Sequence, residues 1–224
     1  MQETFCCGRT FPAFLFCFSE QQYSILYTFI LTMPATLTSR EILKEHLAKT
    51  VSLTEEEFNY FYSHLKPASF TKGHTIISVG DRVDQEYFVL KGCLKTFYTS
   101  EDLKMYILQF AMPTWWASDY GALYGREKAT VSVDCITDAD VLCLSDADRE
   151  KLCQEVSALG YFFRWRSNMG YLAQQKRLLS YMNNDTKSRY EELMHMYPQL
   201  YNIVPKQLIA AYLGVSRETL SRLY

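Results

Sequence analysis

The chain has 224 residues, of which 48% are apolar and 21% are charged, and its formal net charge is −2. This is the composition of an ordinary globular protein with room for one large domain or two modest ones, and it offers nothing that supports an enzyme. A net charge near zero excludes a uniformly basic nucleic-acid binder. Because a small basic region can be hidden in that average, charge has to be counted region by region.

The first 33 residues contain two apolar runs, 11–18 and 25–33, divided by a polar segment. A membrane-spanning helix needs about 20 mainly apolar residues, which neither run supplies. A signal peptide needs a basic start and one continuous apolar run, and Arg9 alone is a weak start. Because Met33 opens a plausible beginning for a cytoplasmic protein, we expect residues 1–32 to be a loose N-terminal extension or a mis-assigned gene start.

Seven cysteines lie at positions 6, 7, 17, 93, 135, 143 and 153. Their number is odd, and their spacings contain no CxxC pair of the kind that holds zinc, so no metal site is predicted. Cys135 and Cys143 lie in apolar, strand-like runs, where free cysteine acts as a small core residue. This usage predicts a reducing, cytoplasmic compartment.

Residues 38–65 are predicted to form two helices. Thr38 is a candidate N-cap of the first, whose apolar residues recur at helical spacing. Thr54 and Glu57 stand at capping-box spacing and predict the start of the second helix. Pro67 is expected to end it, because the residue before a proline is disfavoured in a helix.

From Phe70 to Ser145 the pattern changes to short runs rich in Val, Ile, Tyr, Phe and Thr, separated by turn residues. Residues 130–135 alternate between polar and apolar, which is typical of a half-buried strand. The predicted strands are His74–Val79, Glu86–Leu90, Cys93–Thr99, Lys104–Phe110, Thr130–Ile136 and Val141–Ser145. Strands this short and closely spaced predict a compact sandwich or roll.

Beyond Asp146 the helical period returns, with apolar residues at the heptad spacing that pairs helices. The seam consists of Phe162, Trp165, Met169, Leu172, Lys176 and Leu179. A helix laid against the roll would also carry an apolar stripe. We favour a helix covered on two sides, because Phe163, Leu178 and Met182 fall off the seam. Residues 183–185 are predicted to be a hinge, and residues 186–196 another helix.

Residues 206–223 satisfy the requirements of a helix-turn-helix. Ala210 is small enough for the point where two helices cross, and Gly214 suits a turn with positive φ. Ser216 is placed to cap the second helix and to leave free N–H groups facing a phosphate. The apolar residues expected to lock the two helices together are Ile209, Leu213, Val215, Leu220 and Leu223.

The second helix of this motif is expected to expose Arg217, Glu218, Ser221 and Arg222. Arginine can bond guanine O6 and N7, and glutamate can accept a hydrogen bond from cytosine N4. With Lys206, these residues give three positive charges and one negative one, a local balance of +2 in a net-negative chain. A plain helical hairpin would rarely meet all these requirements together, so we favour DNA binding.

The segment Val215–Arg222 resembles the recognition helix of the Crp/Fnr family of transcription regulators. The resemblance implies that Arg217, Glu218 and Arg222 read base edges in the major groove. It implies that Ser216 and Gln207 touch phosphates.

Upstream, Gly80 and Gly92 with residues 87–91 between them resemble the paired turn glycines of the family's cyclic-nucleotide-binding β-roll. The likeness covers about residues 40–224. It is strong in the helix-turn-helix, good around these glycines and weak elsewhere.

The resemblance implies an α+β fold: a cyclic-nucleotide-binding β-roll, or jelly roll, with flanking helices, a long dimerisation helix and a C-terminal helix-turn-helix. The expected domains are the extension 1–32, a sensory roll with N-terminal helices over 33–145, a dimerisation helix over 146–183 and a DNA-binding domain over 184–224. The implied partners are double-stranded DNA, a second copy of the chain, RNA polymerase and a small effector of unknown identity, with no membrane.

The chain departs from the family in the phosphate-binding cassette, where cyclic-nucleotide binders have a Gly-Glu pair and an Arg-Ser pair. Here Asp119 replaces the glutamate, and Ala129 occupies the arginine position unless Lys128 substitutes for it. Lysine lacks the fork that grips two phosphate oxygens, so tight binding of cyclic AMP is not expected. The expected pocket, for another ligand or for none, is lined by Trp116, Ser118, Asp119, Lys128 and Thr130. The alternative for the tryptophan is a plain core position.

Other sites and functions are less well supported. Some family members bind an iron–sulfur cluster, but an adjacent Cys6-Cys7 pair followed by Cys17 fits the required spacing poorly, so no cofactor is identified. A ligand-binding module without DNA function would have an intact cassette and a degenerate recognition helix, the reverse of this sequence. The four histidines, at positions 46, 64, 74 and 195, lie in no metal or nucleophile motif, and we therefore set an enzyme aside. The chain stops at Tyr224, where family members commonly continue further.

Overall fold

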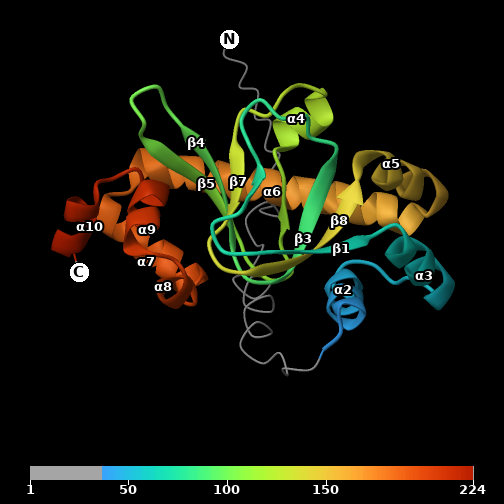
Figure 1. Cartoon of the computed structure of the whole chain (residues 1–224). Coiled ribbons are helices and arrows are strands. Elements are labelled where there is room, and N and C mark those ends of the chain that lie inside the picture. The colour runs from blue at the N-terminus through green and yellow to red at the C-terminus, as the bar shows by residue number, and fades with distance from the viewer. Residues whose placement is uncertain (1–36, 224) are drawn as a thin grey trace, which may run out of the picture. The chain divides into compact units, whose positions relative to one another are not determined.

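A computed structural model describes residues 37–223, so the predicted extension 1–32 lies outside the described residues (Figure 1). The helices are α2 (Ser39–Ala48), α3 (Glu55–Ser63), α4 (Tyr120–Gly125), α5 (Asp146–Glu155), α6 (Ser157–Asn183), α7 (Thr186–Met196), α8 (Leu200–Ile203), α9 (Lys206–Leu213) and α10 (Arg217–Leu223). The strands are β1 (Lys66–Phe70), β2 (Thr75–Ile77), β3 (Gln85–Lys91), β4 (Leu94–Thr99), β5 (Met105–Ala111), β6 (Trp116–Ala117), β7 (Ser132–Cys135) and β8 (Ala139–Ser145).

The strands form two four-stranded antiparallel sheets, in the orders β1-β8-β3-β6 and β2-β7-β4-β5. The six predicted strands are confirmed, with ends shifted by up to two residues, and β1 and β6 are additional. The sequence pattern marked Pro67 only as the end of a helix. Because β1 is an edge strand, the missing N–H of this proline is tolerated within it. β6 is too short to show an alternation of polar and apolar residues in the sequence.

The turn that joins β3 to β4 needs a residue without a side chain. Gly92 has a φ of +90°, and a Cβ atom added there would lie 2.2 Å from the main-chain oxygen of Asp138. A side chain at this position would therefore both strain the backbone and collide with the start of β8. The predicted role of this glycine as a turn residue is confirmed.

The helices before the roll begin as predicted. The Thr38 and Thr54 hydroxyls accept hydrogen bonds from the main-chain N–H groups of Glu41 and Glu57, and the two glutamate side chains complete both capping boxes. The apolar faces of α2 and α3 pack against the sheet and against the first turns of α6. This cluster includes Leu43, Leu47, Phe58, Phe61, Phe88, Leu144 and Leu159.

The helical region predicted over 146–183 is divided into α5 and α6. Val156 adopts an extended conformation (φ −123°, ψ 98°) and its side chain is buried, so packing overrides helical propensity there. In Figure 1, α6 runs across the roll from α5 at one end to α7–α10 at the other. Among the helices of residues 37–223, none combines the length and the apolar character that crossing a membrane requires.

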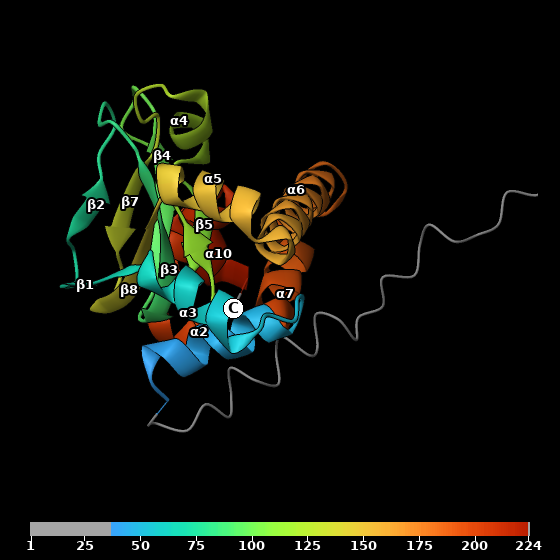
Figure 2. The same ribbon diagram turned by 90° about the vertical axis from the view of Figure 1, so that its right-hand side faces the viewer.

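The C-terminal helices share an apolar core with the second sheet. Leu193, Leu200, Val204, Ile209 and Leu213 belong to one buried cluster together with residues of β5 and of the turns beside it. These sheet-side members are Cys93, Ile107, Phe110, Met112 and Ile136. Figure 2 views the molecule from the end that carries α5, with the C-terminal helices behind the strands of the roll. The helices α7, α8, α9 and α10 are thus packed on the β-roll of the same chain.

Candidate nucleic-acid interface and ligand cassette

The two helices of the predicted helix-turn-helix, α9 and α10, meet as the sequence requires. Ala210 is buried where they cross, and Leu213 and Leu220 are buried between them. Gly214 ends α9 with a φ of +71°, in the left-handed region that favours glycine. A Cβ atom added there would lie 3.3 Å from the ring of Tyr181 on α6. The turn therefore needs glycine both for its backbone and for its close approach to α6.

The first turn of α10 carries the polar groups that were expected to face DNA. The Ser216 hydroxyl accepts a hydrogen bond from the Thr219 N–H at 3.1 Å, which confirms the predicted cap. Hydrogen bonds from its own N–H and from the Ser216 side chain hold the pKa of Glu218 below its usual value. Glu218 is therefore an ionised acceptor at neutral pH, as pairing with a cytosine amino group requires.

The remaining predicted DNA contacts are also on the surface. Arg217, Ser221 and Arg222 are exposed on α10, and Lys206 and Gln207 are exposed in the first turn of α9. The apolar sides of both helices face the core. The polar face of α10 is consequently exposed, while its apolar face is buried against α9.

Asp119 organises the cassette region from within. Its Oδ1 accepts a hydrogen bond from the Ala122 N–H at the start of α4, at 3.0 Å. Its Oδ2 accepts from the N–H groups of Thr130 and Val131, at 2.8 and 3.1 Å. Burial disfavours the charged carboxylate, but these bonds outweigh burial and lower the pKa of Asp119. These three N–H groups are thus already occupied by the protein's own carboxylate.

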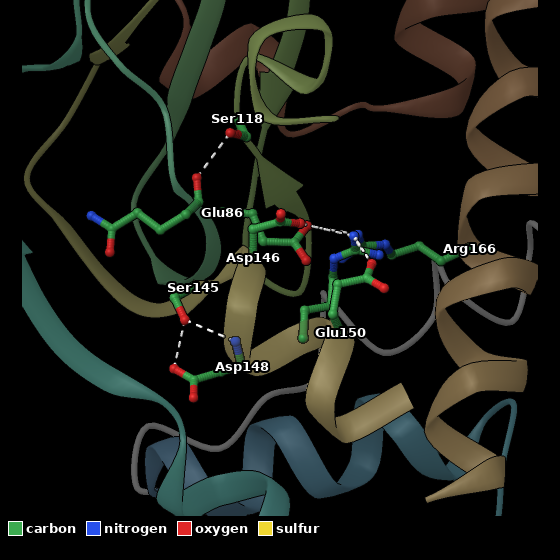
Figure 3. A network of polar contacts seen from close by, with 9 residues as sticks. Glu86, Ser118, Ser145, Asp146, Asp148, Glu150 and Arg166 are labelled. Carbon is green, nitrogen blue, oxygen red and sulfur yellow. Dashed lines mark hydrogen bonds and ion pairs between the residues drawn. The ribbon is translucent and has the colours of Figure 1, made fainter. Parts of the chain in front are cut away.

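The other predicted lining residues differ in burial. Trp116 is buried in the core, where its ring packs against Phe88 at 5.1 Å. Ser118 donates a hydrogen bond to the Gln85 main-chain oxygen at 3.0 Å (Figure 3). Lys128 and Thr130 are exposed. The predicted pocket residues therefore divide between core and surface.

Ala129, which occupies the position of the cassette arginine, is buried. Its N–H donates to the Asp81 main-chain oxygen, and its carbonyl accepts from the Gly80 N–H, both at 2.8 Å. The loop is thus tied to the turn before β3 by its backbone. A side chain at position 129 faces the protein interior.

A buried ion pair links the roll to α6, and sequence reasoning missed it. Arg166 of α6 donates to the carboxylate of Glu86 on β3 at 2.6 Å, and their side chains are 16% and 1% exposed (Figure 3). The guanidinium lies 4.7 Å from the Trp116 ring centroid and 5.0 Å from that of Phe163. Burial opposes the charge on Arg166, but the Glu86 carboxylate raises its pKa. The one sign of this ion pair in the sequence was a charged residue, Glu86, at the start of an otherwise apolar strand.

The predicted seam of α6 divides into two parts. Phe162 is fully buried in its own chain, so its side chain is not available to a partner. Trp165 and Met169 are half-buried, whereas Leu172 and Leu179 are exposed by 38% and 50%. The first part of the seam is thus covered by the apolar core of its own chain, whereas the second part of the seam is exposed.

Comparison with known proteins agrees with the β-roll and the helices described above. Residues 67–156 match the sequence model of the cyclic nucleotide-binding domain. These residues have the cyclic nucleotide-binding fold. Asp119 and its hydrogen-bonded N–H groups lie within the matched residues. No curated protein sequence matches the chain.

The solved structures that share the fold include those of three bacterial regulators. CLP of Xanthomonas campestris, described as a c-di-GMP responsive global regulator, is 16% identical, with a TM-score of 0.58 over 76% of this chain and 89% of its own. FixK2 of Bradyrhizobium japonicum is 16% identical, with a TM-score of 0.59 over 71% and 82%. A Crp/Fnr-family transcriptional regulator of Eubacterium rectale is 13% identical, with a TM-score of 0.60 over 76% and 82%. The domain and the helices that follow it thus have the fold of Crp/Fnr regulators.

Proposed function

We propose that the chain is a sequence-specific DNA-binding transcription regulator of the Crp/Fnr type that reads DNA as a homodimer. The observation that carries this proposal is the exposed polar face of α10. Arg217, Glu218 and Arg222 project from a helix whose opposite side is anchored in an apolar core, and Ser216 caps its first turn. Arginine and glutamate on one exposed helix face are suited to base edges in the major groove.

The proposed dimer surface is the second half of α6. It exposes large apolar side chains, and contiguous exposed apolar surface marks a site of association. These residues are Tyr171, Leu172, Leu178, Leu179 and Met182. Pairing of two copies along α6 would place two α10 helices on successive major grooves, about 34 Å apart along the DNA.

The proposed signal enters through the cyclic nucleotide-binding domain. Asp119 occupies the N–H groups of the cassette and Ala129 supplies no cation, so an effector that binds through a cyclic phosphate fits this site poorly. The effector is therefore of a different chemical class, or the domain transmits a signal from a protein partner. Any effector can shift the regulator only by binding its two conformations with unequal affinity.

The test is selection of random duplex DNA by the purified protein at a stated salt concentration. We expect enrichment of a two-fold symmetric motif. Arg217→Ala and Arg222→Ala should each relax the preference at single positions, at a cost of about 1–3 kcal/mol of binding free energy. Lys206→Ala should weaken binding to all sequences alike and reduce the salt dependence. Retention of no sequence above background by a folded dimer would show the proposal to be wrong.

A further inference from the structure

Arg177 lies where α6, β5 and α9 meet. Its Nη1 donates a hydrogen bond to the Leu108 main-chain oxygen at 2.5 Å, and its Nη2 donates to the Ile107 oxygen at 2.7 Å. The same Nη2 donates to the main-chain oxygen of Tyr212, near the end of α9, at 3.0 Å. Its guanidinium also lies 3.9 Å from the centroid of the Tyr212 ring. One side chain on α6 therefore holds the sensory roll and the helix-turn-helix together.

The two β5 oxygens are available because of a local irregularity. In the β4–β5 ladder, Thr96 pairs with Gln109 and Phe97 with Ile107, which leaves Leu108 as an extra residue in β5. β5 is also the last strand of its sheet. Consecutive carbonyls of a regular strand point to opposite sides, whereas a bulge disturbs this alternation. The bulge at the free edge thus presents neighbouring oxygens to one guanidinium fork.

Aromatic contacts surround the same position. Tyr181, one helical turn beyond Arg177, also donates its hydroxyl to the Tyr212 main-chain oxygen. The Tyr181 ring lies against Gly214, the turn glycine of the helix-turn-helix. On the other side, the Tyr212 ring stacks on Phe110 of β5 with 5.3 Å between centroids. The end of α9 is therefore fixed from α6 and from β5 at once.

The hydrogen bonds of Arg177 fix the direction of α9, whereas apolar packing only keeps α9 against the roll. The apolar cluster beneath α9 can hold the helix-turn-helix on the roll, but apolar packing tolerates small shifts in direction. Charge-assisted hydrogen bonds from a planar guanidinium to fixed main-chain oxygens are directional. They define where the end of α9 stands relative to β5, whichever side chains surround it. α10 follows α9 directly, so its direction is defined as well.

We infer that Arg177 is a positioning residue for DNA recognition, which sets the spacing between the two reading helices without contacting DNA. This inference rests on the proposed function. In a dimer paired along α6, the direction of each α10 relative to its own roll determines how far apart the two half-sites must lie. Loss of Arg177 should therefore broaden the accepted spacing and leave base preference within each half-site unchanged.

The experiment compares wild-type protein with Arg177→Met, Arg177→Lys and the matched control Arg164→Ala. Arg164 is also an arginine of α6, exposed and on the part of the helix next to the roll. Binding is measured on DNA in which two fixed half-sites are separated by spacers of every length over one helical turn. We expect Arg177→Met to bind the optimal spacer about tenfold more weakly and to lose its preference among neighbouring spacers, since three charge-assisted hydrogen bonds are removed. Arg177→Lys should restore part of the preference, and Arg164→Ala should match wild type.

An unchanged spacer preference in Arg177→Met would overturn the inference, even if overall affinity fell. Hydrogen exchange of the same folded proteins tests it independently of DNA. Amides of α9 and α10 should exchange about tenfold faster in Arg177→Met, while those of β3 and β8 exchange as in wild type. If wild type selects no DNA, the proposed function fails while this exchange result still decides whether Arg177 holds the helix-turn-helix. Equal exchange in Arg177→Met and Arg164→Ala would overturn the positioning role.

Discussion

The buried pair of Glu86 and Arg166 allows a quantitative prediction. Arg166→Met removes the guanidinium and leaves the carboxylate of Glu86, which is 1% exposed, without its cation. Removing one partner of a buried pair costs about 3–5 kcal/mol, because the remaining charge keeps its desolvation penalty. Arg166 is 16% exposed, so water already reaches part of this site. We therefore expect a loss at the lower end, about 3 kcal/mol in the free energy of unfolding.

The double variant Glu86→Leu/Arg166→Met removes the desolvation penalty of the two buried charges together with their mutual attraction. Replacing a buried pair by apolar residues of similar volume is often neutral or stabilising, so we expect it within about 1 kcal/mol of wild type. Urea unfolding of wild type, both single variants and the double variant at one pH gives the coupling energy directly. Arg164→Met, an exposed control on the same helix, should change stability by less than about 0.5 kcal/mol. A double variant no more stable than Arg166→Met would refute the reasoning.

Three further predictions concern pH, the turn glycine and the helix cap. Burial, with the charges of Lys49 and Arg166 contributing, lowers the pKa of His46 from 6.5 to about 3. Below pH 6.5 the unfolded chain therefore binds a proton at His46 that the folded chain does not bind. The free energy of unfolding should fall by about 2 kcal/mol between neutral pH and pH 5 for this reason. Denaturant titrations of His46→Phe should show a smaller fall in the free energy of unfolding over the same pH range. Gly214→Ala should cost at least about 1 kcal/mol by thermal unfolding, whereas Gly170→Ala, within α6 where an added Cβ meets nothing within 4 Å, should stabilise by about 0.5–1 kcal/mol. Ser216→Ala should cost about 1 kcal/mol and weaken DNA binding, and an unchanged unfolding midpoint would contradict its role as a cap.

Local patterns in the sequence were sufficient for most of the elements. Thr54 and Glu57 marked a helix start, the alternation at 130–135 marked β7, and Gly214 marked a turn, because each depends on residues only a few positions apart. The proposed DNA-contacting residues follow from the same kind of evidence, since an exposed helix face is fixed by helical periodicity. The interruption of the long helix at Val156 could not be predicted, because packing around a buried valine causes it.

The sequence by itself therefore determined the order of most of the elements, the predicted helix-turn-helix over residues 206–223 and the absence of an arginine at position 129. Only the tertiary structure decided what that absence means, because the carboxylate of Asp119 accepts hydrogen bonds from an N–H group of α4 and from two N–H groups of the loop that precedes β7. The same is true of Arg166, whose partner lies 80 positions earlier in the chain, and of Arg177, whose partners lie 70 positions earlier and 35 positions later. Hydrogen bonds and ion pairs over such separations leave no periodicity to detect, since folding alone brings their partners together.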